Sequence, residues 1–526
     1  MFTAPDAATA GAPRATAAGA QIPSDTPPPA RPLRRLAAAM ACKRLPAERL
    51  EAFLSGERST AQRLRDWFGS DIAHFTDPQS LIGALERDIA LLDDMLSRQL
   101  NALLHHRAFQ RLEASWRGLA YLTRCAAGNQ MILVRVLNIS WRDLAADFER
   151  AADFDQSHLF AKIYSQEFGM PGGTPYGILL CDYDVHHRPS ADSPVDDVAA
   201  LAGLASVAAA AFAPAILSAS PRLLGLDHFL ALDHASTLSG LYRSSEYQRF
   251  NRLRDLDDAR FLGLVLPRIL MRAPYAQDGV AGIGFRYRED VHGLSHEQMC
   301  WGSAIYAFGE VVMRAFDLHG WFADICGGRR DQLDHGIVDG LSAPSVETDA
   351  PGTVERFASE LVIPTQIEQD LWQLGLISLN VCKDTDRLVF YTSSSIQNVP
   401  AHRSSVAAAN ARISAMLRYI LCVSRFAHYI KVRIRGRVGS YVTAEACEND
   451  LQKWLLGYCL GNDDASAEMK ARFPLREASA EVRAVPGRPG AFTCVLHLRP
   501  HFQLDQIFTT FKLVTDVALP HSSPAF

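Results

Sequence analysis

Residues 196–220 read DDVAALAGLASVAAAAFAPAILSAS, and a second apolar run, YGILLCDY, precedes them at residues 176–183. The shorter run has the length of a buried strand. The two aspartates that open the longer stretch suit an N-cap and a first helical turn, and Pro214 ends the helix that follows. AILSAS (215–220) then predicts a short strand. A strand, a helix and a second strand in this order predict a parallel pair joined by a helical crossover.

The same alternation continues on both sides of this unit. Residues 141–168 and 295–317 have helical patterns, and they lie between further strand candidates. The fold class predicted is therefore a mixed α/β fold with a central, largely parallel sheet and flanking helices. The further strand candidates are MILVRVL (131–137), RFLGLVLP (260–267), GWFADI (320–325) and RLVFYTSSS (387–395).

Residues 198–217 carry no charge over about twenty positions, which is long enough to cross a bilayer. Alanine supplies little transfer energy, and an N-terminal acid pair and a proline bound the stretch, so we interpret it as a buried helix of a soluble protein. The 526 residues include 53 basic and 58 acidic side chains, for a net charge of −5. That balance argues against a nucleic-acid partner and against a polybasic membrane anchor.

Composition and periodicity divide the chain into four parts. An Ala/Pro-rich tail (1–32), for which we expect disorder, precedes a helical N-terminal region (33–125) and a central α/β body (126–392). The helices expected at 78–105 and 107–124 could be core helices or a partner-facing hairpin, because the pattern fits both.

The last part, residues 393–526, is predicted to combine helices with an antiparallel sheet. Helices are expected at about 403–430 and at 443–459, and three runs with alternating hydrophobicity follow. A Gly/Pro turn separates the first two, so they form a hairpin to which the third can add. Such a small sheet needs a helix layer, and an open edge on it would pair with another chain. The three runs are residues 478–485, 491–499 and 506–517.

Motifs for catalysis are missing from the sequence. It has no phosphate-binding loop, no complete dinucleotide-binding glycine pattern, no G-x-S-x-G elbow and no C-x-x-C pair. Asp182 and Asp184 follow a buried strand, where α/β enzymes place their sites, so they are the best enzyme candidates. Capping of the strand end or a surface ion pair is the favoured interpretation of both.

A basic cluster lies near the middle of the chain, with acids beside it. Its arginines are interpreted as members of ion pairs, either within the chain or at an interface. The cluster comprises Arg268, Arg272, Arg286 and Arg288, with Glu289 and Asp290 as neighbours.

Seven phrases in fixed order carry a resemblance that covers roughly residues 75–515. The chain resembles the large sheath subunit of the bacterial type VI secretion system, the TssC/VipB/EvpB family. The phrases are FQRLEASWRGLAYL (109–122), LGLVLPRILMRAPY (262–275), GFRYRED (284–290), WGSAIYAFGEVVMRAF (301–316), HGWFADICGG (319–328), LRYILCVSRFAHYIKV (417–432) and LRPHFQLDQI (498–507).

The resemblance implies a phage-tail-like sheath fold and a structural, cytoplasmic protein without catalytic, cofactor or metal residues. Its implied partners are a small sheath subunit (TssB/VipA-like), copies of itself, the Hcp inner tube, baseplate components and an AAA+ disassembly ATPase. An α/β enzyme and a non-polymerising adaptor of the same fold are the alternatives. Strands exchanged from terminal arms are expected to join neighbouring subunits. The positions expected to contact a partner or the lattice are Phe492, Cys494, Leu496, Leu498, Phe508 and Phe511.

Overall fold

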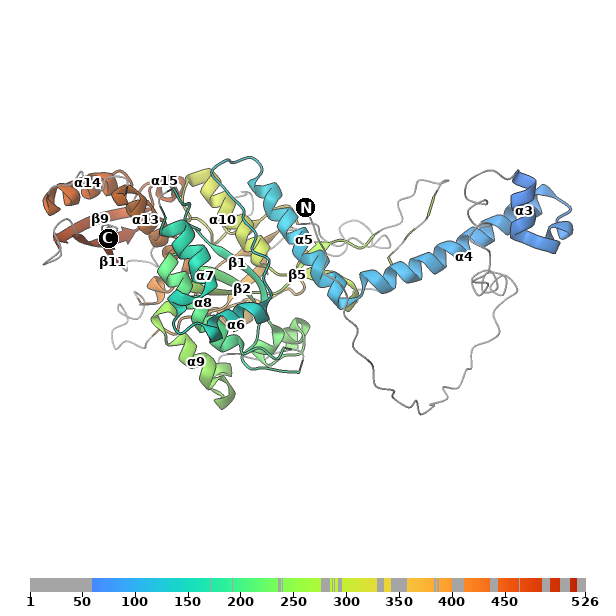
Figure 1. The fold of residues 1–526 in the computed structure, drawn as a ribbon, viewed down its shortest axis with the longest axis horizontal. Coiled ribbons are helices and arrows are strands. Elements are labelled where there is room, and N and C mark those ends of the chain that lie inside the picture. Colours follow the sequence, from blue (N-terminus) through green and yellow to red (C-terminus); the bar gives the residue numbers. More distant parts are fainter. Residues whose placement is uncertain are drawn as a thin grey trace, which may run out of the picture. The chain divides into compact units, whose positions relative to one another are not determined.

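The fold is that of a computed structural model (Figure 1). It forms two compact units, Met1–Leu100 with Gln277–Tyr287, and Asn101–Ala276 with Arg288–Phe526. The structure describes residues 59–517 apart from 171, 192, 235–237, 239, 276–283, 286, 288, 292–295, 329–334, 342–356, 383–384, 386, 400–410, 436–442, 463, 485–491 and 502–510.

The first unit is helical where it is described. It contains α3 (Thr60–Phe68), a 3-10 turn (Gly69–His74) and most of α4 (Pro78–Leu104). The rings of Phe68 and Phe75 meet edge to face, with 5.0 Å between their centroids. The indole N–H of Trp67 donates to the Asp88 carboxylate at 2.9 Å, which fastens α3 to α4.

A six-stranded sheet forms the centre of the second unit, as the alternation of apolar runs predicts. Its strand order is β1-β2-β3-β7-β8-β6. Strands β1, β2, β3 and β7 are parallel to one another, whereas β8 runs antiparallel to both β7 and β6. The strands are β1 (Leu179–Val185), β2 (Ala215–Ala219), β3 (Leu262–Leu266), β6 (Ile337–Val338), β7 (Ile377–Val381) and β8 (Leu388–Phe390).

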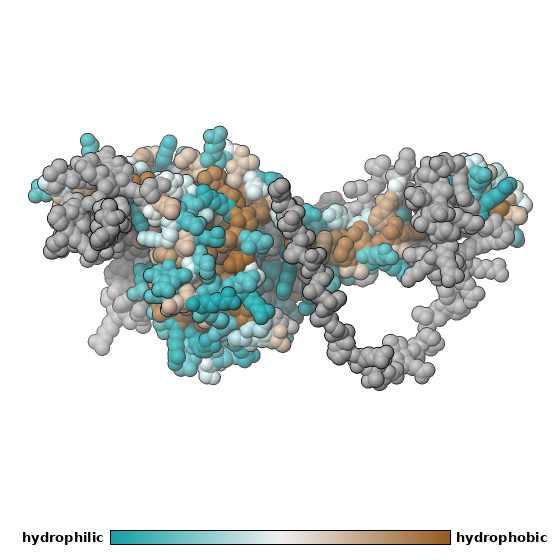
Figure 2. All heavy atoms as spheres, viewed as in Figure 1, coloured by the Kyte–Doolittle hydropathy of each residue, from teal (hydrophilic) through white to brown (hydrophobic). Residues whose placement is uncertain are grey.

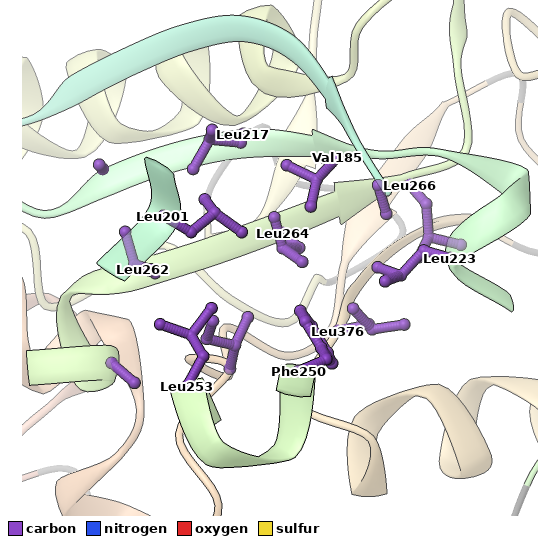
Figure 3. Close-up of a cluster of buried hydrophobic side chains, with 14 of the residues drawn as sticks. Val185, Leu201, Leu217, Leu223, Phe250, Leu253, Leu262, Leu264, Leu266 and Leu376 are labelled. Atoms are coloured by element: carbon purple, nitrogen blue, oxygen red, sulfur yellow. The ribbon is translucent and has the colours of Figure 1, made fainter. Parts of the chain in front are cut away.

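Helix α8 (Asp197–Ala211) covers one face of this sheet. It is the Ala-rich stretch, and its N-cap is Asp196, whose side chain accepts a hydrogen bond from the N–H of Ala199 at 3.3 Å. Leu201 of α8 packs into the same cluster as Leu217 and Leu264 of the sheet (Figure 3). The helix is thus a buried one, and no helix among the described residues is both long and apolar enough to span a membrane.

Helices α10 (Ile305–His319) and α13 (Leu417–Arg435) cover the opposite face. Because successive residues of a strand point to opposite faces, Ile216 and Val265 meet these helices while their neighbours meet α8. All five residues of β2 and all five of β3 are buried as a result.

The second unit contains further helices and strands. Short 3-10 turns and one π-helical turn (Ala161–Phe168) join them. They are α5 (Arg107–Ala126), α6 (Trp141–Arg150), α7 (His158–Phe160), α9 (Gln248–Arg254), β4 (Ile269–Arg272), β5 (Cys300–Gly302), α11 (Thr365–Gln373), α14 (Ala444–Leu456), α15 (Ala467–Arg472), β9 (Leu475–Ala484), β10 (Phe492–Pro500) and β11 (Phe511–Val517). Of these, α14, β9 and β10 pack with α13 in a hydrophobic cluster of their own.

Two strand predictions are wrong. MILVRVL (131–137) joins no sheet, because its backbone has no strand partner within the described residues. GWFADI (320–325) is a bend, and it is apolar because it packs against the C-terminal helices: the Trp321 ring stacks on Phe426 at 4.4 Å. Of the helix expected at 403–430, residues 403–410 lie outside the described residues.

One buried acid on α10 gives the fold a pH dependence. Glu310 is 4% exposed, and its Oε1 lies 3.4 Å from Nε of Arg314. Burial raises its pKa from 4.5 to about 7, although Arg314 opposes the shift. The folded chain therefore keeps this proton up to about pH 7, whereas the unfolded chain releases it near 4.5. Stability is lost as the pH rises through that window.

We predict that Glu310→Gln flattens this pH dependence. Wild-type protein should lose on the order of 2–3 kcal/mol of unfolding free energy between about pH 5 and pH 8 from this group, whereas the variant cannot ionise there. Urea unfolding at several pH values measures the difference. Glu477→Gln serves as the control, because the Glu477 side chain is 69% exposed. Parallel profiles for Glu310→Gln and wild type would contradict the prediction.

Candidate assembly interface

The C-terminal sheet has two edges that differ in their surroundings. Its order is β11-β10-β9, and both pairs are antiparallel. The β9 edge is covered, because Gln452 of α14 bonds both the carbonyl of Ala478 and the N–H of Ala480 at 2.9 Å. Glu448, one turn earlier, accepts from the N–H of Val482 at 2.9 Å. Side chains of α14 thus occupy the outward backbone groups of β9.

Strand β11 forms the other edge of this sheet. Among the described strands it pairs with β10 alone, from Phe492↔Val517 to Leu498↔Phe511. A strand that is bonded on one side leaves its remaining N–H and C=O groups open to another chain. The geometry therefore offers one edge for strand addition and protects the other.

Three of the expected contact positions have side chains that point into this chain's own core. Cys494, Leu496 and Leu498 are fully buried and pack with α13 and α14. Their backbone is paired on both sides, with β9 and with β11, because β10 is the central strand of this sheet. Phe492 begins β10 and Phe511 begins β11, while Phe508 lies outside the described residues. Contact of all six positions with a partner stays a prediction.

Asp182 and Asp184 are both exposed on β1. The Asp182 carboxylate accepts hydrogen bonds from the hydroxyl of Tyr306, at 2.9 Å, and from the hydroxyl of Ser115. These bonds join β1 to α10 and α5, so Asp182 links these elements through hydroxyl groups and not through the strand-end cap or ion pair of the favoured interpretation. Among the described residues, no group of three or more His, Cys, Asp or Glu side chains is arranged to hold a metal ion.

The arginine cluster forms ion pairs within the chain. Arg272 of β4 makes two bonds to Glu289, at 2.5 and 3.1 Å, and a third to Glu113 of α5 at 2.8 Å. Burial opposes ionisation of Glu289, but Arg272 and the N–H of Tyr275 hold its pKa below the ordinary value. Arg268 pairs with Glu360 at 3.0 Å. Arg286 and Arg288 lie outside the described residues.

Helix α4 carries a regular apolar stripe on its surface. Four side chains recur every seven residues, the spacing that keeps one helix face toward a partner helix. Figure 2 shows this apolar surface along the helix. The sequence pattern indicated the helix but not that this face is exposed. The exposed fractions are 54% for Ile82, 53% for Ile89, 48% for Leu96 and 52% for Leu103.

Comparison with known families identifies the family of this chain. The family model described as the EvpB/VC_A0108 tail sheath N-terminal domain matches residues 86–397. A second, described as the EvpB/VC_A0108 tail sheath gpW/gp25-like domain, matches residues 406–517. The chain belongs to the VipB/EvpB family of tail sheath proteins. The family resemblance read from the sequence is thereby confirmed.

Two similar proteins are also sheath proteins. The type VI secretion system sheath protein TssC1 of Pseudomonas aeruginosa is 34% identical over 437 residues, which cover 82% of this chain and 86% of that protein. The sheath tail protein of Desulfitobacterium hafniense is 9% identical, covers 60% of each chain and has a TM-score of 0.27. That TM-score is too low to support statements about this VipB-family chain.

Within this VipB-family chain, removing one partner of the buried Arg272 network should be costly, because it leaves a buried charge uncompensated. We predict that Glu289→Gln lowers the unfolding free energy by about 3 kcal/mol, because it leaves a buried guanidinium short of its charge partner. Denaturant unfolding at neutral pH measures the loss. Asp257→Asn is the control: it breaks a pair with Arg260 in which the Asp257 side chain is 91% exposed, so it should cost less than about 0.5 kcal/mol. Equal losses for the two variants would contradict the prediction.

Proposed function

We propose that this chain is the large subunit of a type VI secretion contractile sheath. It pairs with a small TssB/VipA-like subunit, and the pairs polymerise in the cytoplasm into a helical tube around an inner tube of Hcp. Contraction of the sheath drives the inner tube outward from a baseplate, and an AAA+ ATPase recycles the contracted form. Membership of the VipB/EvpB family and the TssC1 relative support this proposal.

The observation that carries the proposal is the asymmetry of the C-terminal sheet. Strand β9 has its outer edge covered by Gln452 and Glu448, whereas β11 pairs only with β10 among the described strands. Strand addition can then proceed from one side only. A one-sided contact of this kind joins unlike surfaces, and when its rotation does not close it generates a helical filament.

The energy of such a joint suits a sheath that must move. Each backbone hydrogen bond contributes about 0.5–1.5 kcal/mol net, so a short strand adds several kcal/mol without locking the bodies that it links. The rigid bodies can then repack against one another while the strands keep them tethered. The chain's work in this scheme is mechanical and uses no catalytic group. The hydrogen bonds of Asp182 to Ser115 and Tyr306 are consistent with that role.

Removal of residues 502–526 tests the proposed joint. This deletion removes β11 and keeps the β9–β10 hairpin, which Leu496 and Leu498 anchor to the helices. We expect the variant to co-purify with the small sheath subunit but to form no tubules in negative-stain electron microscopy, because its assembly edge is lost.

The control deletes the same number of residues from the other end, 1–25, and should leave tubules unchanged. Normal tubules from the 502–526 deletion would contradict the strand joint. A wild-type chain that stays monomeric when the small subunit is present would contradict the sheath function itself.

A further inference from the structure

Residues 131–138, MILVRVLN, connect α5 to α6 as an irregular segment with unused backbone groups. The N–H of Met131 bonds the side chain of Asn129, and the N–H of Ile132 bonds its carbonyl. No backbone hydrogen bond joins residues 133–138 to any other described residue. The segment thus has the sequence of a strand but is neither helix nor strand in the structure.

Side chains hold this segment in place. The hydroxyl of Tyr183 on β1 donates to the carbonyl of Ile139 at 2.7 Å. Arg135 donates to Oγ1 of Thr174 at 2.9 Å and also pairs with Glu167. The Tyr183 side chain therefore links the end of the segment to β1. Backbone hydrogen bonds, which hold paired strands roughly 4.8 Å apart, are not formed between the two. These side-chain contacts leave the backbone groups of residues 133–138 without a bond to another described residue.

The segment also exposes apolar side chains that a partner would cover. Burial removes apolar surface from water, so leaving several such side chains exposed forgoes a considerable stabilisation. Its only charge, Arg135, is already paired with Glu167, and it contains neither lysine nor proline, the residues that commonly protect exposed strands. The exposed fractions are 72% for Met131, 67% for Leu133, 65% for Val136 and 48% for Leu137.

A cavity opens at the end of the segment. It has a volume of about 340 Å³ and is lined by Leu137 and Ile139 of the segment and by Leu159 of α7, with Asp143 and Lys162 among its polar members. A hollow of this size with an apolar side can receive one large apolar side chain. An extended peptide fits both features. Its backbone can bond the segment, and one of its apolar side chains can enter the cavity.

We propose that residues 133–138 receive an extended, alternating apolar segment of the small sheath subunit, which adds to them as a strand and inserts an apolar side chain into this cavity. The inference rests on the proposed function for the identity of the second chain. A second copy of this chain is the less suitable occupant, because two identical segments pairing antiparallel form a closed two-fold dimer, and such a contact cannot propagate a tube.

The first test is hydrogen–deuterium exchange on the purified wild-type heterodimer, which requires no variant to fold. Amides of residues 133–138 should exchange at least tenfold more slowly than their intrinsic rate, because a partner strand now bonds them. Exchange at the intrinsic rate in a stable heterodimer would overturn this inference and leave the proposed function standing. The same protection in this chain alone, rising with its concentration, would assign the segment to self-association and overturn it as well.

The second test is the double variant Leu133→Asp/Val136→Asp. Charges at these exposed positions should weaken binding of the small subunit at least tenfold, as measured by titration of the purified chains. The matched control, Leu256→Asp/Leu318→Asp, alters two exposed leucines elsewhere on the body (45% and 57% exposed) and should bind as wild type does. Equal affinities for both variants would overturn the inference, whereas failure of the wild-type chain to bind at all would contradict the proposed function.

Discussion

The structure depends on one constraint, the need of a parallel sheet for apolar cover on both faces. Strands β2 and β3 are buried at every residue, and they remain so only because α8 packs on one face and α10 with α13 on the other. The length and alanine content of α8 follow from this position, since small side chains let a helix lie close to a sheet. The Arg272–Glu289 pair then fixes β4 and the segment that contains Glu289 against α5 at the border of the same core.

Helices can cover the faces of a sheet, but they do not supply a strand partner for its edges or for a connecting segment. In this chain such unpaired backbone lies at one sheet edge and in one connecting segment. The β9 edge is closed by side chains of α14, while β11 and residues 133–138 keep backbone groups without a strand partner among the described residues. The seven-residue stripe of α4 adds a helical surface of the same kind. A chain that leaves the backbone of an edge strand and of a connecting segment without a strand partner among the described residues is suited to assembly by strand addition.

Much of the fold could be predicted from the sequence, because long apolar runs bounded by acids and proline have few alternatives. The N-cap at Asp196 and strands β2 and β3 follow directly from such runs. The order β1-β2-β3-β7-β8-β6 could not be predicted, since strand pairing depends on contacts between distant parts of the chain.

The two wrong strand predictions have related causes. MILVRVL has the composition of a strand, but a strand also needs a partner, and the chain itself supplies none among its described residues. GWFADI is apolar because Trp321 packs on Phe426, a contact that no local pattern reveals. The alternating C-terminal runs did form strands, yet the alternation could not show that Leu496 and Leu498 point into this chain's own core.

Cryo-electron microscopy of the tube formed with the small subunit is the most direct test of the claim that strand edges build the assembly. We expect a strand of a neighbouring chain hydrogen-bonded to β11, with α14 still covering β9. A map in which β11 faces solvent and helices alone join the subunits would contradict it.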